Sequence, residues 1–169
     1  MVFNGQISSI FIRPEPNEPV VEIAQVLAIP GKGLEGDYYF AGIAPKGTEP
    51  AREITLIEKE TLQALETEHS IYLSPAESRR NLFTKNVPLN HLVGKEFRVG
   101  HVALRGIRLC EPCSHLASLV KKELLPALVH RGGLRAQILT KGIIYVGDTV
   151  SNLDNIPDDE EVAHAEPDQ

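Results

Sequence analysis

The sequence predicts a mainly β fold, an antiparallel or mixed β-barrel with a few helices, in a single domain over residues 1–153. Its 169 residues suit one domain with a substantial hydrophobic core. Alternating or β-branched runs outnumber runs with helical spacing, and glycine or proline separates them. Only two cysteines are present, which argues against a disulfide-stapled secreted scaffold.

The first third of the chain predicts two strands. Asn4–Ile12 alternates loosely between apolar and polar residues and indicates a strand that ends before a proline-rich turn. Val20–Ala28 is a β-branched run that predicts a second strand. Pro30-Gly31-Lys32-Gly33 ends it, and residues 42–50 contain too many glycines and prolines for regular structure.

The middle of the chain predicts a strand over Glu53–Ile57 and a helix over Glu58–His69 with a partial apolar face. Ser74-Pro75-Ala76-Glu77 matches a capping box with proline at the first helical position. We expect one or two helical turns there, carrying Arg79 and Arg80.

Val93–Leu109 predicts a hairpin in which Gly106 forms a bulge. With plain alternation, Arg108 and Cys110 project to the same face as Leu104.

The last third predicts a helix and a closing hairpin. Ser114 caps the helix, and Pro126 ends or kinks it. Leu134–Leu139 and Ile143–Val150 then form two paired strands around the breaker Thr140-Lys141-Gly142.

The net charge of −6 is concentrated at the C-terminus. Seven of the 23 acidic residues lie from Asp154 onward, which leaves 16 acids against 17 bases in the body. Residues 154–169 therefore predict an acidic, disordered tail. A nearly neutral body is a poor surface for duplex nucleic acid. The N-terminus lacks a signal-peptide pattern and no stretch suits a membrane span, so we expect a cytoplasmic protein without a membrane partner.

Both cysteines lie in one stretch, Arg108-Leu109-Cys110-Glu111-Pro112-Cys113-Ser114-His115, near many of the arginines. Neighbouring cations favour the reactive thiolate, and guanidinium groups bind phosphate or carboxylate as a planar fork. The stretch therefore predicts a site for an anionic ligand that needs a thiolate. Two alternatives stay open: a redox dithiol formed by Cys110 and Cys113, and small buried cysteines of structural role. Zinc is disfavoured, because no second ligand pair accompanies these residues.

Other residues also have two interpretations. Arg79-Arg80-Asn81 and Arg131-Gly132-Gly133 could each hold an anion, although an isolated arginine is more commonly solvated or paired with a carboxylate. Asp37 could act as an acid or form a turn after Gly36, and His115 could contact a ligand or cap the helix that begins at Ser114.

Several segments together resemble the molybdenum-cofactor sulfurase C-terminal (MOSC) domain family over residues 4–150. In chain order they are Gly33-Leu34-Glu35-Gly36-Asp37, Arg79-Arg80-Asn81-Leu82, Leu92-Val93-Gly94-Lys95-Glu96-Phe97-Arg98-Val99-Gly100, Glu111-Pro112-Cys113, Arg131-Gly132-Gly133 and Val146-Gly147-Asp148. The family's fold is β-rich and barrel-like. Its members include sulfur-handling domains and reductases that use a molybdenum–pterin cofactor, and the family is also associated with pyridoxal phosphate.

The resemblance implies that Cys113 ligates molybdenum or carries sulfur, whereas Cys110 has no fixed counterpart. Tyr38-Tyr39 stands where many relatives have Arg-His, so substrate specificity does not transfer. No fused electron-transfer or desulfurase domain accompanies this chain, so an electron or sulfur donor would be a separate protein.

We therefore expect a molybdenum–pterin-binding domain that reduces N-hydroxylated compounds or transfers sulfur to or from a small molecule. The expected catalytic residues are Cys113, His115 and Asp37, with Cys113 as the metal ligand. The expected cofactor-binding residues are Arg79, Arg80, Asn81, Arg108, Arg131 and Arg135. The rival functions are a sulfur or cofactor carrier without turnover and a Cys-x-x-Cys thiol–disulfide redox protein.

Overall fold

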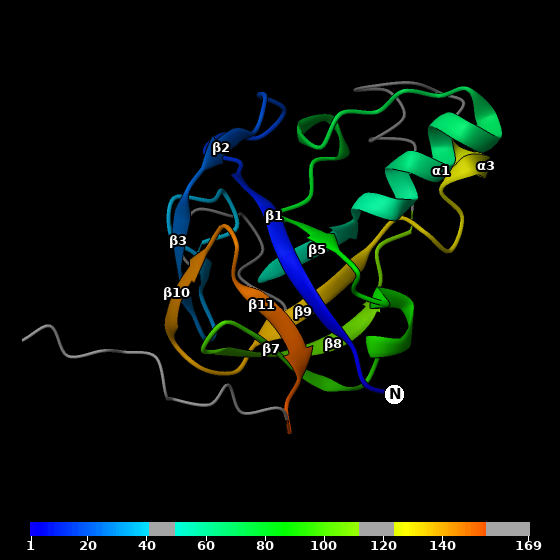
Figure 1. Cartoon of the computed structure of the whole chain (residues 1–169). Coiled ribbons are helices and arrows are strands. Elements are labelled where there is room, and N and C mark those ends of the chain that lie inside the picture. Colours follow the sequence, from blue (N-terminus) through cyan, green and yellow to red (C-terminus); the bar gives the residue numbers. More distant parts are fainter. Residues whose placement is uncertain (41–49, 112–123, 155–169) are drawn as a thin grey trace, which may run out of the picture.

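The computed structural model describes residues 1–40, 50–111 and 124–154. Its centre is a closed, mixed β-barrel of seven strands, with helices at one end (Figure 1). This confirms the predicted fold class. In order around the barrel, the strands are β11 (Thr149–Asn152), β7 (Glu96–Val99), β8 (Val102–Leu109), β9 (Leu134–Ile138), β5 (Ile54–Glu58), β6 (Leu82–Lys85) and β1 (Asn4–Ile12).

Strand β1 closes the barrel, because it pairs antiparallel with β6 on one side and with β11 on the other. Its bounds are those predicted, and its Ile7 and Ile10 are buried in the core. Of the described strand pairs in the barrel, β5–β6 alone is parallel. The first and last strands are therefore hydrogen-bonded neighbours.

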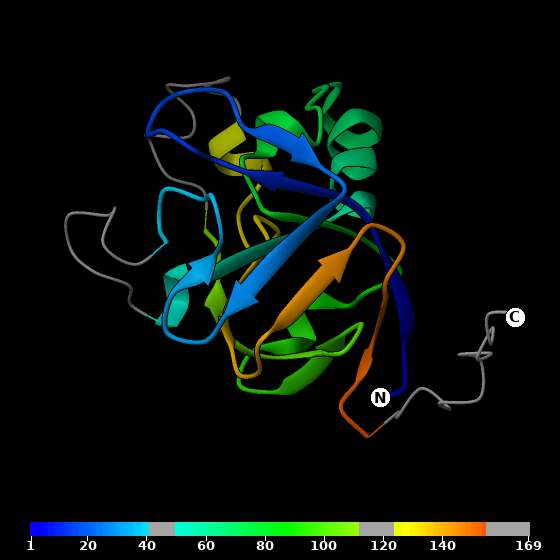
Figure 2. The ribbon, with the colours of Figure 1, turned by 90° about the vertical axis from the view of Figure 1, so that its left-hand side faces the viewer.

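The run Val20–Ala28, predicted as one strand, forms two strands that belong to different sheets. β2 (Val21–Ile23) pairs with β1, whereas β3 (Gln25–Ile29) belongs to a three-stranded sheet. That sheet consists of β10 (Gly142–Tyr145), β3 and β4 (Gly33–Leu34), and Figure 2 shows β3 and β10 side by side. β-branched composition indicates extended backbone but does not specify the pairing partner, so the prediction merged the two strands.

The predicted closing hairpin is also wrong. β9 pairs with β5 and β8, whereas β10 pairs with β3, so the strands on either side of Thr140-Lys141-Gly142 are not partners. The predicted strand Ile143–Val150 is interrupted at Val146-Gly147-Asp148 and continues as β11. There the Ile7 N–H donates to the Asp148 carbonyl and the Gly147 N–H donates to the Ile7 carbonyl. The break itself is a turn, in which Gly147 has a φ of 92° and the Asp148 N–H donates to the Tyr145 carbonyl.

The hairpin of β7 and β8 forms as predicted, with an irregularity between Gly106 and Arg108. A Cβ at Gly106 would lie 2.0 Å from the Leu92 carbonyl oxygen, so a side chain does not fit there. The bulge reverses the alternation of β8. Leu104 is buried in the barrel core, whereas Arg108 is exposed. The prediction that these two residues share a face is therefore wrong.

The helices lie outside the barrel. α1 (Lys59–His69) follows β5 directly, and its Leu65 packs with Leu73, Ala127 and Leu128 beside α3 (Leu124–Ala127). Pro126 lies within α3, which ends one residue later. The helix predicted from Ser114 lies outside the described residues as far as position 123. Residues 41–49 and residues 155–169 of the predicted tail also lie outside them.

The capping box at Ser74 is confirmed. Ser74 N–H donates to Glu77 Oε2 at 2.8 Å, and Glu77 N–H donates to Ser74 Oγ at 3.2 Å. It begins a 3-10 turn, η2 (Ala76–Ser78), rather than one or two α-helical turns. Two further 3-10 turns are η1 (Pro50–Arg52) and η3 (Leu89–Leu92). None of the helices in the described part of the chain is long and apolar enough to span a membrane.

Candidate functional site

Three of the predicted cofactor-binding residues lie in one row across neighbouring strands of the barrel. Thr55 pairs with Arg135, and Arg135 pairs with Arg108. On the other side of Thr55, the Asn81 backbone N–H donates to the Thr55 carbonyl. The residues next to them, Leu56, Leu82 and Leu134, point into the barrel core, so the row faces outward. Asn81 and Arg108 are three strand spacings apart, about 14 Å.

Asn81 holds strands together. Its Nδ2 donates to the Phe11 carbonyl at 3.1 Å and to Asp37 Oδ2 at 3.2 Å. Its Oδ1 accepts from the N–H and from the hydroxyl of Thr55, both at 3.0 Å. These four bonds use both donors and both acceptor positions of the amide. The side chain is therefore occupied within the fold, and its role toward a cofactor stays a prediction.

Asp37 is buried next to Asn81. Its Oδ2 accepts from the Arg13 N–H at 2.9 Å as well as from Asn81, and its Oδ1 accepts from the Tyr39 N–H at 3.1 Å. The carboxylate thus ties the end of β1 to the segment before β6. These bonds suit the turn-forming interpretation of Asp37, and its role as an acid stays a prediction.

Three arginines gather around Tyr39; we refer to Arg13, Arg52, Arg79 and Tyr39 as the arginine corner. Arg13 Cζ lies 5.3 Å and Arg52 Cζ 5.8 Å from the centroid of the Tyr39 ring. Arg79 belongs to the corner because the charges of Arg13 and Tyr39 both act on it. Arg79 has a φ of 58°, a left-handed conformation just before Arg80-Asn81.

Arg79 has hydrogen-bonding groups without partners. Its Nη1 donates to the Glu18 carbonyl at 2.9 Å, but no described group accepts from its buried Nε and Nη2. Arg13 Nε is buried and unpartnered in the same way. Burial, and then the nearby charge of Arg13, lower the pKa of Arg79 from its usual value. Nε and Nη2 form one edge of the guanidinium, which is the edge that binds two oxygens of an oxyanion.

Arg108 and Arg135 are directly opposite each other on β8 and β9, and we refer to them as the arginine pair. Like charges in this position repel. Neither arginine has a carboxylate partner within the described ranges. Arg105, three residues earlier on β8, differs because it forms an ion pair with Glu96 at 2.5 Å. The arginine pair thus leaves two positive charges on the outer face without compensation.

Arg80 and Cys110 lie close to the end of this row. Arg80 Nε donates to the Gly132 carbonyl at 2.9 Å, and the Cys110 N–H donates to the Gly133 carbonyl at 2.7 Å. Gly133 has a φ of 102°, and a Cβ there would lie 2.1 Å from the Leu56 carbonyl oxygen. A side chain cannot be accommodated at this crossing, which explains the glycines after Arg131. The Cys110 side chain is a free thiol with only 1% exposure.

Glu111 and His130 connect the two chain segments on either side of residues 112–123. Glu111 Oε2 accepts from the His130 N–H at 3.0 Å, and its Oε1 lies 3.0 Å from His130 Nδ1. The hydrogen bonds from the backbone and then the side chain of His130 lower the pKa of Glu111. Cys113 and His115, the predicted catalytic residues, lie outside the described residues and begin two positions beyond Glu111 in the sequence.

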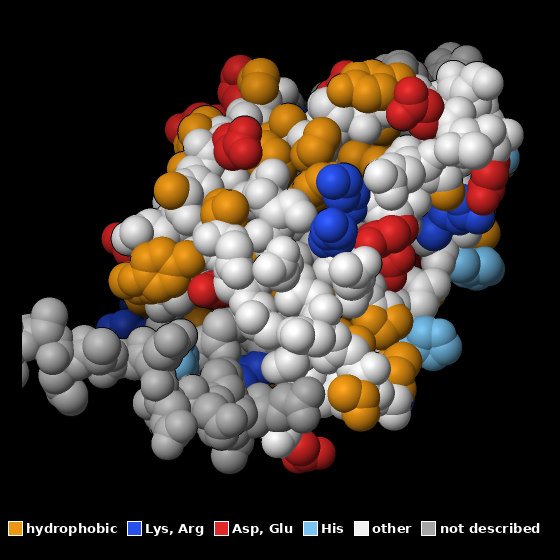
Figure 3. Space-filling model, viewed as in Figure 1, with side chains coloured by type: hydrophobic (Ala, Val, Ile, Leu, Met, Phe, Trp, Pro, Cys, Tyr) orange, Lys and Arg blue, Asp and Glu red, His pale blue; other side chains and the backbone are white. Residues whose placement is uncertain are grey.

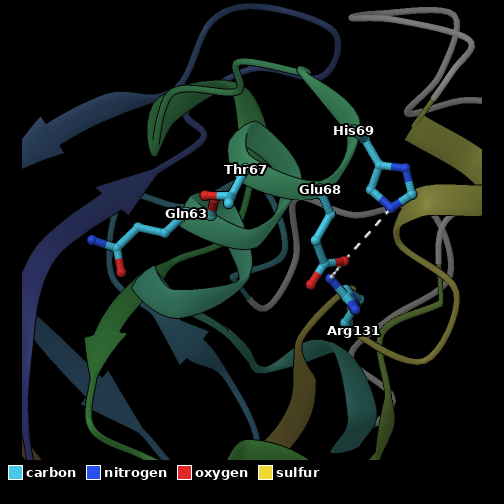
Figure 4. A network of polar contacts seen from close by, with 5 residues as sticks. All are labelled: Gln63, Thr67, Glu68, His69 and Arg131. Carbon is cyan, nitrogen blue, oxygen red and sulfur yellow. Dashed lines mark hydrogen bonds and ion pairs between the residues drawn. The ribbon is translucent and has the colours of Figure 1, made fainter.

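Arg131 points to a different place. Its Nη1 forms an ion pair with Glu68 Oε2 at 3.0 Å, and His69 Nε2 lies 3.7 Å from the same oxygen. Figure 4 shows Glu68 between the two basic side chains at the end of α1. The structure therefore places Asn81, Arg135 and Arg108 in one outward-facing row and Asp37 beside Asn81, but pairs Arg131 with a carboxylate.

The sequence analysis did not single out Arg13, Arg52 or Glu53. Glu53 is buried, and its oxygens accept from the Gly31 N–H at 2.9 Å and the Ile138 N–H at 2.6 Å. Burial raises the pKa of Glu53, and these two hydrogen bonds partly oppose the rise. The partners of these residues are distant in the chain, so no local signal could have revealed them.

The described residues contain no metal cluster, and the face shown in Figure 3 carries no continuous basic patch. No group of three or more His, Cys, Asp and Glu side chains suited to a metal ion is present among the described residues. On the face shown in Figure 3, basic side chains lie beside acidic ones rather than in a continuous basic patch. The anion-binding potential is therefore local, at the arginine corner and the arginine pair.

These features define a class of protein: a small closed β-barrel whose outer face carries arginines, among them Arg108 and Arg135, without a carboxylate partner in the described part of the chain. The chain belongs to the MOSC domain family, whose model matches residues 44–151. This family is associated with molybdenum cofactor binding. The resemblance inferred from the sequence motifs is thus confirmed.

Solved structures share this fold at low sequence identity. The YuaD protein from Bacillus subtilis is 16% identical, with a TM-score of 0.76, over 89% of this chain and 96% of that chain. YiiM from Geobacillus stearothermophilus is 17% identical, with a TM-score of 0.65, over 86% of this chain and 73% of that chain. YiiM from Escherichia coli is 15% identical, with a TM-score of 0.61, over 94% and 72%. No curated protein matches the sequence.

Proposed function

We propose that this protein binds a molybdenum–pterin cofactor at the arginine corner and the arginine pair, and that it reduces N-hydroxylated compounds or transfers sulfur with Cys113. The observation that carries the proposal is the buried edge of Arg79, whose Nε and Nη2 have no acceptor among the described residues. Family membership supports the cofactor class.

The residues fit such a group. A pterin dithiolene cofactor carries a phosphate, and a phosphate oxygen pair matches the open edge of a guanidinium. A buried, charged donor without an acceptor costs about 1–3 kcal/mol, which an oxyanion would recover on binding. Arg108 and Arg135, which repel each other across β8 and β9, gain in the same way when an anion lies between them.

The cofactor would supply a molybdenum centre for two-electron reduction or sulfur exchange. The protein's own residues have simpler tasks. Arg13 and Arg79 bind the phosphate, and Asp37, which also accepts from Asn81, holds the Arg13 backbone in place. Cys113 supplies a thiolate, which suits a soft metal or a transferable sulfur. Electrons or sulfur would come from a separate donor protein.

The structure does not favour the dithiol alternative. Thiol–disulfide exchange requires an accessible thiol, whereas Cys110 is 1% exposed and free. A sulfur or cofactor carrier would use the same residues as the enzyme, so only turnover with an electron donor separates those two functions.

The test is to express the full chain in a host that makes the cofactor, and to measure molybdenum content and pterin fluorescence. We expect Cys113→Ser to lose molybdenum or activity, with a milder effect from Cys110→Ser. Arg108→Ala with Arg135→Ala should lower pterin retention, whereas Arg105→Ala on the same strand, which is paired with Glu96, serves as the matched control. Equal losses from both cysteine variants, with no metal in the wild type, would reject the proposal in favour of a dithiol.

A further inference from the structure

Tyr39 lies at the centre of the arginine corner, in contact with two guanidinium groups. Arg13 Cζ is 5.3 Å from the centroid of its ring, and Arg52 Cζ is 5.8 Å from it. Both distances fall within the ~6 Å over which an aromatic face attracts a cation. The ring thus connects an arginine that follows β1 with one that precedes β5.

The position of the ring is determined by the turn around it. The Tyr39 N–H donates to Asp37 Oδ1 at 3.1 Å, and the Tyr38 N–H donates to the Arg13 carbonyl at 2.6 Å. The Tyr38 ring packs edge to face against Tyr39, with centroids 5.3 Å apart. Tyr39 is therefore an ordered support beside Arg13, whose own N–H also bonds to Asp37.

An aromatic support has a property that a carboxylate lacks. A carboxylate partner neutralises a guanidinium and occupies its N–H groups, as Glu68 does for Arg131 at 3.0 Å. A ring face attracts the cation but leaves its charge and its in-plane donors available. Because Arg13 and Arg79 repel each other, Arg13 needs such a support to stay at the corner.

We propose that Tyr39 is a positioning residue, whose ring holds Arg13 and Arg52 beside Arg79 so that the corner is pre-organised to bind a phosphate group. The inference rests on the proposed function, in which that phosphate belongs to the pterin cofactor. It assigns a role to Tyr39, the second residue of the Tyr38-Tyr39 pair. Pre-organised donors bind more tightly because less side-chain entropy is lost on binding.

The experiment is calorimetric titration of the cofactor-free full chain with inorganic phosphate at low ionic strength. Tyr39→Leu removes both ring contacts, and we expect phosphate affinity to fall about 5- to 30-fold. Tyr39→Phe keeps the ring face and should bind within about twofold of the wild type. Tyr145→Leu is the control, because Tyr145 is an exposed tyrosine on β10 of the three-stranded sheet.

Each outcome has one meaning. An equal loss from Tyr39→Phe would overturn the proposal, because the hydroxyl would then contact the anion directly. Unchanged affinity in Tyr39→Leu, with binding lost in Arg79→Asn, would overturn the role of Tyr39 but leave the anion site of the proposed function intact. Absence of phosphate binding in the wild type would overturn both.

A second measurement does not depend on the folding of Tyr39→Leu. In NMR spectra of the wild type, the Hε resonances of Arg13 and Arg52 should show upfield ring-current shifts, which Tyr39→Phe should retain. A tyrosine whose ring does not lie over the two guanidinium groups would not produce these shifts. Random-coil positions for both resonances in the wild type would overturn the proposal.

Discussion

The arginine corner and the Arg131 network contain the same side chain in opposite electrostatic situations. At the corner, Arg13 and Arg79 keep buried nitrogens without acceptors among the described residues, and an aromatic ring is the neighbour. At the end of α1, Arg131 has a carboxylate from Glu68 at 3.0 Å (Figure 4). The first arrangement leaves guanidinium N–H groups available to an anion, whereas in the second the guanidinium is already paired with a carboxylate.

This difference separates two motifs that look alike in the sequence. Arg79-Arg80-Asn81 and Arg131-Gly132-Gly133 were both predicted to hold an anion. The glycines of the second motif serve a close approach of the backbone to β5, and its arginine reaches α1 instead of the row on the barrel. An arginine in a motif can therefore be judged as an anion ligand only once it is known whether a carboxylate pairs with it.

The largest expected effect comes from removing Asp37, which holds the corner together. Asp37→Ala leaves three N–H donors without an acceptor, so we expect the free energy of unfolding to fall by roughly 3–4 kcal/mol. Urea denaturation measures this. Glu68→Ala, its counterpart in the Arg131 network, should cost less than about 1 kcal/mol. Similar losses in both variants would mean that the two regions do not differ as described.

The next effect concerns binding. Arg79→Asn keeps a residue that tolerates the left-handed backbone but removes the open guanidinium edge. We expect the affinity for inorganic phosphate to fall about 10- to 100-fold, from the loss of a charged hydrogen-bonding fork worth about 1.5–3 kcal/mol. Arg131→Ala should bind phosphate like the wild type. A loss of affinity in Arg131→Ala instead would show that the anion site had been assigned to the wrong region.

A smaller effect is the pH dependence of the unfolding free energy, which differs between buried and exposed carboxylates. Burial raises the pKa of Glu53 above its usual 4.5, so the folded state keeps this proton to higher pH than the unfolded state. The stability that Glu53 contributes is complete below pH 4.5 and is lost as pH rises through the raised pKa. Unfolding free energies of the wild type minus those of Glu53→Gln should therefore decrease with rising pH.

For the exposed Glu111, the pH dependence of the stabilising contribution has the opposite sign. Hydrogen bonds from His130 lower the pKa of Glu111, so its stabilising contribution is present above the usual value of 4.5 and is lost as pH falls through the lowered pKa. The same subtraction with Glu111→Gln should increase with rising pH. Parallel curves for the two variants would contradict this assignment.

The smallest effect is the coupling between Arg131 and Glu68. Both side chains are more than one-third exposed, so a double-mutant cycle should give about 0.2–1 kcal/mol. The coupling should decrease further when salt is added, because salt screens exposed charges. A coupling of several kcal/mol would show that the network stabilises the end of α1 far more than an exposed ion pair does.

Local patterns predicted the elements whose structure depends on neighbours in the chain. Asn4–Ile12 alternates because one of its faces is buried, and the capping box at Ser74 closes within four residues. The errors arose where pairing is non-local. Val20–Ala28 divides between two sheets, and the bulge after Gly106 turns Arg108 outward. The alternation of apolar and polar residues does not by itself specify which strand is the pairing partner.

The candidate site shows the same limit. Arginine-rich motifs and glycines indicated an anion site, and the structure does place Arg108 opposite Arg135 on the outer face and leaves Arg79 with nitrogens that have no acceptor among the described residues. Arg13 contacts Asp37 and Tyr39, which are more than 20 residues away, so its membership was not visible in the sequence. Conversely, the amide of Asn81 is bonded to three segments of the chain, a use that its motif did not indicate.

Closure of the barrel through β1 and β11 has a consequence for how the chain folds. Asn4 and Ser151 are paired partners, so the seam joins residues from the two ends of the domain. During synthesis, β1 can meet β2 and β6 early, but the Asn4–Gln6 part of its other edge and the edge of β7 have no partner until residues 149–152 leave the ribosome. Closing so long a loop is slow, and open strand edges invite aggregation meanwhile. Substitutions that weaken β11 should therefore reduce the yield of native protein in the cell more strongly than its stability once folded.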